Sequence, residues 1–380
     1  MRILKQQIEI ADQFLVCFEF KKLENLHLAF LSRLKDSTSF FEDKETDCES
    51  ARFNIFIQQR LKASFVTNEK VSKLELTANI DRLWISCYKT KVQVGVNEVR
   101  KENIVFTEEF AEQKNIKYIA LCETAYFRCT YFSYSKFPFL QNIPLLITSN
   151  STLTELDKNV SVKVNHLSKE IQELYADIVD IELDTSDFPD FSDAINHSLV
   201  TEGALCYEKL KEKSGEFGAD NLQQTYIRIS LNVNKADSPG TPLILELWSG
   251  QHYSPIHQHS NCNAVIKILH GSLTLKTFRS LCDTKEPLDN LHLSKNQITW
   301  LDSKHYQTHQ LVNHNVHGNM CATLNYYMYD HDDNTHYEYF DYKDDKSEIQ
   351  QFEPKSDFTF SEFKLKILEE WNNFYNKKKV

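Results

Sequence analysis

The chain has 380 residues, which is about twice the size of a common domain, so two domains are expected. Hydrophobic residues make up 41% and aromatic residues 12% of it, which supplies a sizeable core and excludes disordered and fibrous chains. With 43 basic and 54 acidic residues the formal net charge is −11, and this charge opposes binding to nucleic acid and to anionic membrane surfaces.

The sequence also bears on the compartment. No stretch approaches the ~20 apolar residues of a membrane span, and polar residues interrupt the first fourteen positions before an apolar run of signal-peptide length develops. The nine cysteines are scattered, without a CxxC pair, which argues against a disulfide framework and a structural zinc site. We therefore expect a soluble, cytoplasmic protein.

The first part of the chain, residues 1–155, mixes two kinds of pattern. Residues 5–34 are rich in helix-forming residues, whereas residues 91–96 alternate polar and apolar side chains as a half-buried strand does. Residues 118–122 and 126–140 are further strand candidates. We expect an N-terminal α+β domain of unknown function, because no nucleophile, phosphate loop or metal cluster rises above background in it.

Residues 156–380 are expected to form the second domain. Apolar residues at three- and four-residue spacing predict helices within residues 155–213. From about residue 224 the pattern changes to short strands separated by turns, one of them at His270-Gly271, and this pattern indicates a β-sandwich or barrel. The predicted strands are residues 226–233, 243–248, 264–269, 272–278, 297–301, 308–312 and 321–329.

The end of the chain reverts to a helical pattern. Thr359 and Glu362 have the spacing of a capping box. Apolar residues then recur at helical spacing from Phe363 to Phe374. We therefore expect a C-terminal helix that begins at residue 359 or shortly after it.

The segment that carries chemistry runs from Trp248 to His259. In a strand, His257 and His259 project from the same face, so both imidazoles can share one cation. Gly271 follows in the turn of the next hairpin, and His309 and Asn313 follow as an HxxxN sequence on a later strand. Together these three features form a much stronger signal for a metal site than an isolated HxH.

This series resembles the metal site of the cupins and, among them, the cysteine dioxygenase (thiol dioxygenase) family. The resemblance covers residues 165–345. It is carried by Tyr226-Ile-Arg228, the segment from Trp248 to Gly271, Asn296-Gln297 leading to His309, and Asn313. It implies that the second domain is a mainly β cupin, a jelly-roll barrel, preceded by helices.

The resemblance implies that His257, His259 and His309 are the three ligands of a non-haem ferrous ion, Fe(II). Most cupins add a glutamate shortly after HxH, but here residues 261–264 read Asn-Cys-Asn-Ala. Three neutral imidazoles leave the charge of the dication uncompensated, so an anionic thiolate can join the coordination shell. Dioxygen would then oxidise the sulfur to a sulfinate.

The resemblance also implies roles for four catalytic residues. Arg228 matches the arginine that pairs with the substrate carboxylate, a role suited to a planar bidentate donor. Tyr226 and Tyr327 match the two phenols near the substrate, with Tyr327 hydrogen-bonding the reacting groups. Asn325 stands where the family has a histidine, which keeps a hydrogen-bonding group but removes a base.

Two further positions depart from the family pattern. Ala264 stands where animal members have the cysteine that is cross-linked to the active-site tyrosine. Met328-Tyr329 replaces the Ser-Pro pair expected after that tyrosine, so the wall of the pocket is rebuilt.

The leading hypothesis is an iron-dependent thiol dioxygenase that oxidises cysteine, or a related small thiol bearing a carboxylate, with O2. The alternative is a non-catalytic metal-binding cupin that acts as a ligand-binding or regulatory module, motivated by the N-terminal extension and by Asn325. A third possibility is a bifunctional enzyme whose N-terminal domain makes or uses the thiol. Consumption of oxygen with a thiol separates the first hypothesis from the second.

Overall fold

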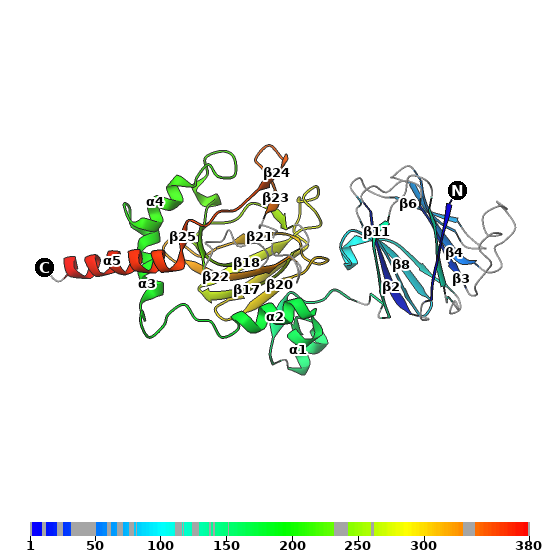
Figure 1. Cartoon of the computed structure of the whole chain (residues 1–380), viewed down its shortest axis with the longest axis horizontal. Helices are drawn as coiled ribbons and strands as arrows, with labels where there is room; N and C mark the ends of the chain where they lie inside the picture. The colour runs from blue at the N-terminus through cyan, green and yellow to red at the C-terminus, as the bar shows by residue number, and fades with distance from the viewer. Residues whose placement is uncertain are drawn as a thin grey trace. The chain divides into compact units, whose positions relative to one another are not determined.

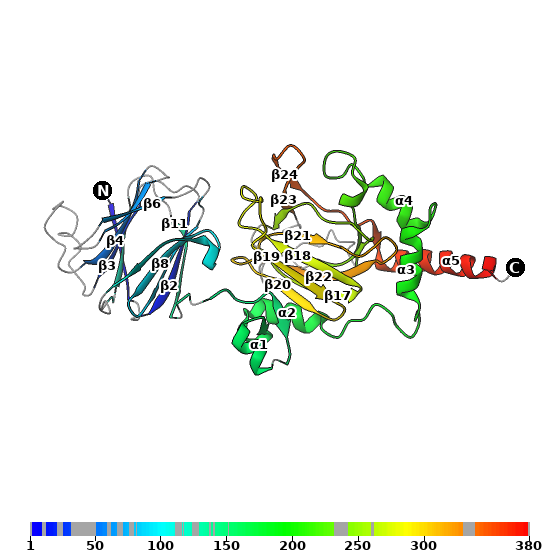
Figure 2. The same ribbon diagram turned by 180° about the vertical axis from the view of Figure 1, so that it is seen from behind.

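The computed structural model describes residues 2–9, 13–20, 26–31, 51–58, 62–66, 71–75, 80, 82–110, 116, 118–123, 129–136, 138–139, 141–150, 152–231, 242–259, 262–329 and 339–378. The chain divides into two compact units, Met1–Asn142 and Ile143–Val380 (Figures 1 and 2). The boundary lies before residue 155 because β12 (Leu146–Thr148) pairs with β13 (Ser161–Lys163) and with β20 (Ile298–Leu301) of the second unit.

The described part of the N-terminal unit is built from two antiparallel sheets, with one 3-10 turn at Lys101–Asn103. The six-stranded sheet has the order β1-β10-β3-β4-β5-β6, with β1 (Arg2–Glu9), β10 (Tyr118–Glu123), β3 (Leu26–Leu31), β4 (Ala51–Gln58), β5 (Lys62–Val66) and β6 (Val71–Glu75). The five-stranded sheet has the order β11-β2-β7-β8-β9, with β11 (Cys129–Ser135), β2 (Phe14–Phe20), β7 (Arg82–Tyr88), β8 (Lys91–Val96) and β9 (Ile104–Glu109).

The prediction of helix within residues 5–34 is wrong for the described residues there, which hold the strands β1, β2 and β3. No α-helix lies among the described residues of this unit, so the α+β class is wrong for them as well. The reason is visible in β2. Phe14, Val16 and Phe18 are buried in one apolar cluster, whereas Cys17 is buried in a second cluster with Trp84. Because both faces of the strand are covered, its sequence has no period-two alternation, and counts of helix formers are overridden by tertiary packing.

Gly95, on β8, is the single glycine in the first 200 residues of the chain. It pairs across the sheet with Trp84, and a Cβ atom at this position would lie 2.0 Å from the Trp84 ring. The indole therefore takes the space that a side chain would need.

The second unit contains two sheets. The eight-stranded sheet has the order β13-β12-β20-β17-β22-β15-β14-β25, with β17 (Asn263–His270), β22 (Cys321–Met328), β15 (Leu243–Trp248), β14 (Ile227–Ser230) and β25 (Phe358–Thr359). The six-stranded sheet has the order β19-β18-β21-β16-β23-β24, with β19 (Asp289–Ser294), β18 (Ser272–Thr277), β21 (Thr308–Val312), β16 (His257–His259), β23 (Phe340–Lys343) and β24 (Ile349–Phe352). A common apolar core joins them.

Helices accompany these sheets (Figures 1 and 2). They are α1 (Leu153–Lys158), α2 (Lys169–Ile178), α3 (Phe191–Val200), α4 (Leu205–Glu212), α5 (Phe360–Lys378) and 3-10 turns at Val164–His166 and Leu222–Gln224. Lys267 of β17 donates to the carbonyls of Val179 and Ile181 at 2.7 Å each, which attaches the end of α2 to the sheet.

The predicted C-terminal helix is confirmed as α5. The Thr359 hydroxyl accepts a hydrogen bond from the Glu362 amide at 3.4 Å, as an N-cap does. Phe363 and Ile367 are fully buried on one face of the helix. Within the described part of the chain, no helix combines the length and the apolar character that crossing a membrane requires.

The turn at Gly271 gives a testable stability difference. Gly271 has a φ of +72°, and a Cβ atom there would lie 2.3 Å from the Met320 carbonyl oxygen. Gly203 has a φ of +82° with no atom within 4 Å of an added Cβ. A substitution there therefore measures only the cost of placing a side chain on a backbone with positive φ. We expect Gly203→Ala to cost about 1 kcal/mol and Gly271→Ala at least about 1 kcal/mol more, measured by chemical denaturation. Equal losses would contradict this expectation.

Candidate metal centre

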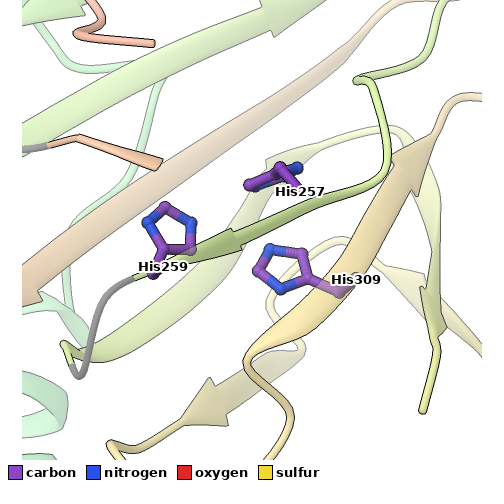
Figure 3. A group of neighbouring side chains, drawn as sticks. All are labelled: His257, His259 and His309. Carbon is purple, nitrogen blue, oxygen red and sulfur yellow. The ribbon is translucent and has the colours of Figure 1, made fainter. Parts of the chain in front are cut away.

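The three predicted histidine ligands come from two adjacent strands of the six-stranded sheet. His257 and His259 are the first and last residues of β16, so they project from the same face. His309 lies on β21, directly opposite His257 in the antiparallel register. Figure 3 shows the three rings turned toward one another, and all three side chains are buried.

The rings are close enough to form one site. A ligand nitrogen of each lies within 4.8 Å of the corresponding nitrogen of the other two. Ring centroids are 5.0 Å apart for His257 and His259, 4.4 Å for His257 and His309, and 5.4 Å for His259 and His309. Two imidazoles that share an ion at ~2.1 Å have nitrogens no more than about 4.2 Å apart, so small ring rotations place all three on one ion.

Backbone carbonyl groups fix the orientation of two rings. The Nδ1 atom of His257 lies 3.0 Å from the Pro255 carbonyl oxygen, and Nδ1 of His309 lies 3.3 Å from that of Tyr306 and 3.2 Å from that of Gln307. Donation from Nδ1–H leaves the Nε2 lone pair for a metal, which is the usual arrangement of ligating histidines. Nδ1 of His259 is buried and has no hydrogen-bond partner among the described residues. The donor set therefore fits a metal ion.

Burial disfavours the protonated form of all three imidazoles. Burial lowers the pKa of His309 to about 4, although the hydrogen bonds to Tyr306 and Gln307 oppose this shift. Burial lowers the pKa of His257 and of His259 well below the usual value, and the neighbouring histidines and the Arg228 charge add to the effect. Neutral imidazole is the form that binds a metal.

These pKa shifts predict how acid affects the site. For imidazoles with the unperturbed pKa of ~6.5, protons would compete with the metal from about that pH downward. We expect the metal content after dialysis to be unchanged at about pH 6 and to fall as the pH approaches 4, where His309 gains its proton. In the metal-free protein, the unfolded chain binds protons below ~6.5 and the folded chain does not, so stability should fall as the pH drops from ~6.5 toward 4. Metal release centred near pH 6.5 would contradict this.

The predicted catalytic residues lie on one face of the eight-stranded sheet. Cross-strand pairs place Arg228 opposite Glu246 and Glu246 opposite Thr323. Asn325 and Tyr327 follow Thr323 at two-residue intervals on β22, so their side chains share its face.

Tyr327 and Tyr226 occupy different environments on this face. The Tyr327 ring is buried, with its centroid 5.2 Å from that of His259. The Tyr226 ring stacks on Trp248 at 4.4 Å and on Phe217 at 6.2 Å. Tyr327 therefore borders His259 directly, whereas Tyr226 is part of an aromatic stack with Trp248 and Phe217.

Arg228 forms a buried ion pair. Its Nη1 atom lies 3.0 Å from Oε1 of Glu246, and the two side chains are 3% and 4% exposed. Sequence reasoning did not single out Glu246. The available signal was its place two residues before Trp248 in an otherwise apolar strand, which puts a carboxylate on the same face as the Trp248 ring.

The two predicted asparagines differ in their hydrogen bonding. Asn325 is fully buried, and neither its amide nitrogen nor its oxygen has a hydrogen-bond partner among the described residues. Buried amides are normally satisfied, so Asn325 has capacity for a ligand or water. Asn313 donates to the carbonyls of Trp248, Ser249 and Asn319 at 3.0 to 3.2 Å, so it fixes the end of β15.

Phe340 is a second residue that sequence reasoning missed. It lies on β23 opposite His259, with its ring centroid 4.8 Å from that of His257 and 5.9 Å from that of His259. It supplies an apolar wall to the histidine group. Phe340 belongs to no recognised motif, and no strand was predicted for the segment that forms β23.

No protein-family model matches the sequence, and no curated protein matches it. Among solved structures, a cupin superfamily protein from Desulfitobacterium hafniense DCB-2 is 10% identical with a TM-score of 0.22, covering 28% of this chain and 81% of that one. A cupin 2 domain-containing protein from Halorhodospira halophila is 12% identical with a TM-score of 0.23, covering 28% and 67%.

Oxalate oxidase in complex with the substrate analogue glycolate is also similar. It is 12% identical with a TM-score of 0.22, and the match covers 28% of this chain and 52% of that one. Each of these matches covers 28% of the chain at a TM-score of 0.22 or 0.23, and they carry no argument about its fold or its activity. What the chain itself contains is a mostly β second unit with three buried histidines that could hold a metal ion.

Proposed function

We propose that the second unit is an iron-dependent thiol dioxygenase, which oxidises a small thiol to its sulfinic acid with O2. The observation that carries the proposal is the group of three buried histidines, which includes no carboxylate ligand among the described residues. A ferrous ion in this group would supply coordination positions for a thiolate sulfur and for dioxygen. Three neutral ligands leave the ion's double charge to attract the thiolate.

The residues around the histidines have separate tasks in this proposal. Tyr327, whose ring borders His259, would donate a hydrogen bond from its hydroxyl to the reacting groups. Asn325 would position a ligand or water with its buried amide. Phe340 would exclude bulk water from the side of His257. Arg228 and Glu246 would set the charge next to the substrate.

The direct test is oxygen uptake by the iron-loaded protein with cysteine, 3-mercaptopropionate and cysteamine, with the sulfinic acid identified by mass. The proposal predicts that oxygen consumption and sulfinate formation match in amount for at least one of these thiols. A His259→Ala variant should show neither. Stoichiometric binding of thiols without oxygen consumption would instead favour a metal-dependent binding or regulatory module.

A further inference from the structure

The ion pair of Arg228 and Glu246 is built into the sheet. The two residues are direct partners in the antiparallel register of β14 and β15, so the carboxylate is held against the guanidinium by the backbone of both strands. Nη1 and Oε1 are 3.0 Å apart, and both side chains are almost completely buried. A surface charge pair would be loose and hydrated, whereas this pair is buried and held by two paired strands.

The ion pair faces the same interior as the histidines. Glu246 is paired with Thr323 on β22, two residues from Asn325 and four from Tyr327 on the same strand face. Tyr327 in turn contacts His259.

The carboxylate of Glu246 changes what Arg228 can select. An arginine alone would attract an anionic group of the substrate. With Glu246 the two charges cancel, and a substrate carboxylate placed against Arg228 would lie next to a second carboxylate in a region of low dielectric. Displacing Glu246 from Arg228 would leave a buried charge without its partner. A tethered carboxylate also competes at a high effective concentration.

We propose that Glu246 is a specificity-determining residue that occupies Arg228 in place of a substrate carboxylate, so the site takes small thiols that lack a carboxylate. The inference rests on the proposed function for the assignment of a thiol as the ligand. The expected substrate is then a thiol without a carboxylate, whereas Arg228 alone would select a thiol that carries one.

The test uses two thiols that differ only at the end remote from sulfur, 3-mercaptopropionate and 3-mercapto-1-propanol. Each is titrated anaerobically into the cobalt-loaded full chain, and binding is followed by the sulfur-to-cobalt charge-transfer band. We expect the alcohol to bind at least about 10-fold more tightly than the acid. In Glu246→Gln, which keeps the shape but removes the charge, the ratio should shift toward the acid by at least about 10-fold.

The control variant is Glu212→Gln, which removes a carboxylate from the exposed end of α4 and should leave the ratio unchanged. Tighter binding of the acid by the wild-type protein would overturn the role of Glu246, whether or not Glu246→Gln folds. An unchanged ratio in a folded Glu246→Gln protein would do so too. Absence of the band with both thiols would overturn the proposed function itself, so the two failures are distinguishable.

Discussion

Replacing His309 with alanine is expected to abolish metal binding while leaving the fold intact. Loss of a residue that only orients a ligand typically weakens metal binding by 10- to 100-fold, so loss of the ligand itself should cost more than about 100-fold. His309 is buried and lies opposite His257. The His309→Ala variant keeps only the imidazoles of His257 and His259 in the histidine group. Affinity for Fe(II) is measured by competition with a chelator under anaerobic conditions.

His314→Ala is the matched control, since this histidine lies exposed just beyond β21 and outside the histidine group. It should bind Fe(II) as the wild-type protein does, and circular dichroism should show that both variants are folded. Wild-type affinity in His309→Ala, or an equal loss in His314→Ala, would show that the metal is held elsewhere.

Replacing Arg228 with methionine is expected to destabilise the second unit strongly. The change leaves the buried carboxylate of Glu246 without the guanidinium at 3.0 Å, and breaking such a buried pair costs about 3–5 kcal/mol. Removing both charges in Arg228→Met with Glu246→Leu should recover most of this loss, since a well-packed apolar pair is often as stable as a buried ion pair. Chemical denaturation of the full chain, followed by circular dichroism, measures both effects.

The surface pair of α5 provides the comparison. Lys366 and Glu362 are 2.8 Å apart, with side chains 46% and 49% exposed, and Lys366→Met should change stability by less than about 1 kcal/mol. If Arg228→Met costs no more than Lys366→Met, or if the double variant is no more stable than Arg228→Met alone, Arg228 does not stabilise the fold by compensating the buried charge of Glu246.

Local periodicity made a large part of the second unit predictable from its sequence. The strands at residues 243–248 and 308–312 have the predicted bounds, because turn-forming residues flank both segments in the sequence. The two-residue spacing of His257 and His259 is itself a strand signal, although β16 is only three residues long. The assembly of these two residues with His309 requires the register of β16 and β21, which periodicity does not contain.

Local periodicity does not predict strands that are buried on both faces, nor contacts between residues far apart in the sequence. The apolar residues of β2 pack on both sides of the strand, so the strand lacks alternation and its residues were interpreted as part of a helix. Arg228 was predicted to pair with a substrate carboxylate, and its partner within the chain, Glu246, is not apparent from the sequence because it lies 18 residues away. Only the alignment of β14 with β15 brings their charges together.

X-ray absorption spectroscopy of the iron-loaded protein, recorded anaerobically before and after addition of 3-mercapto-1-propanol, tests the central claim most directly. We predict one iron per chain with imidazole nitrogens as its protein ligands, and a sulfur ligand that joins them when the thiol is added. A further protein ligand that fills the coordination shell and keeps sulfur out would contradict the account, as would iron bound without imidazoles.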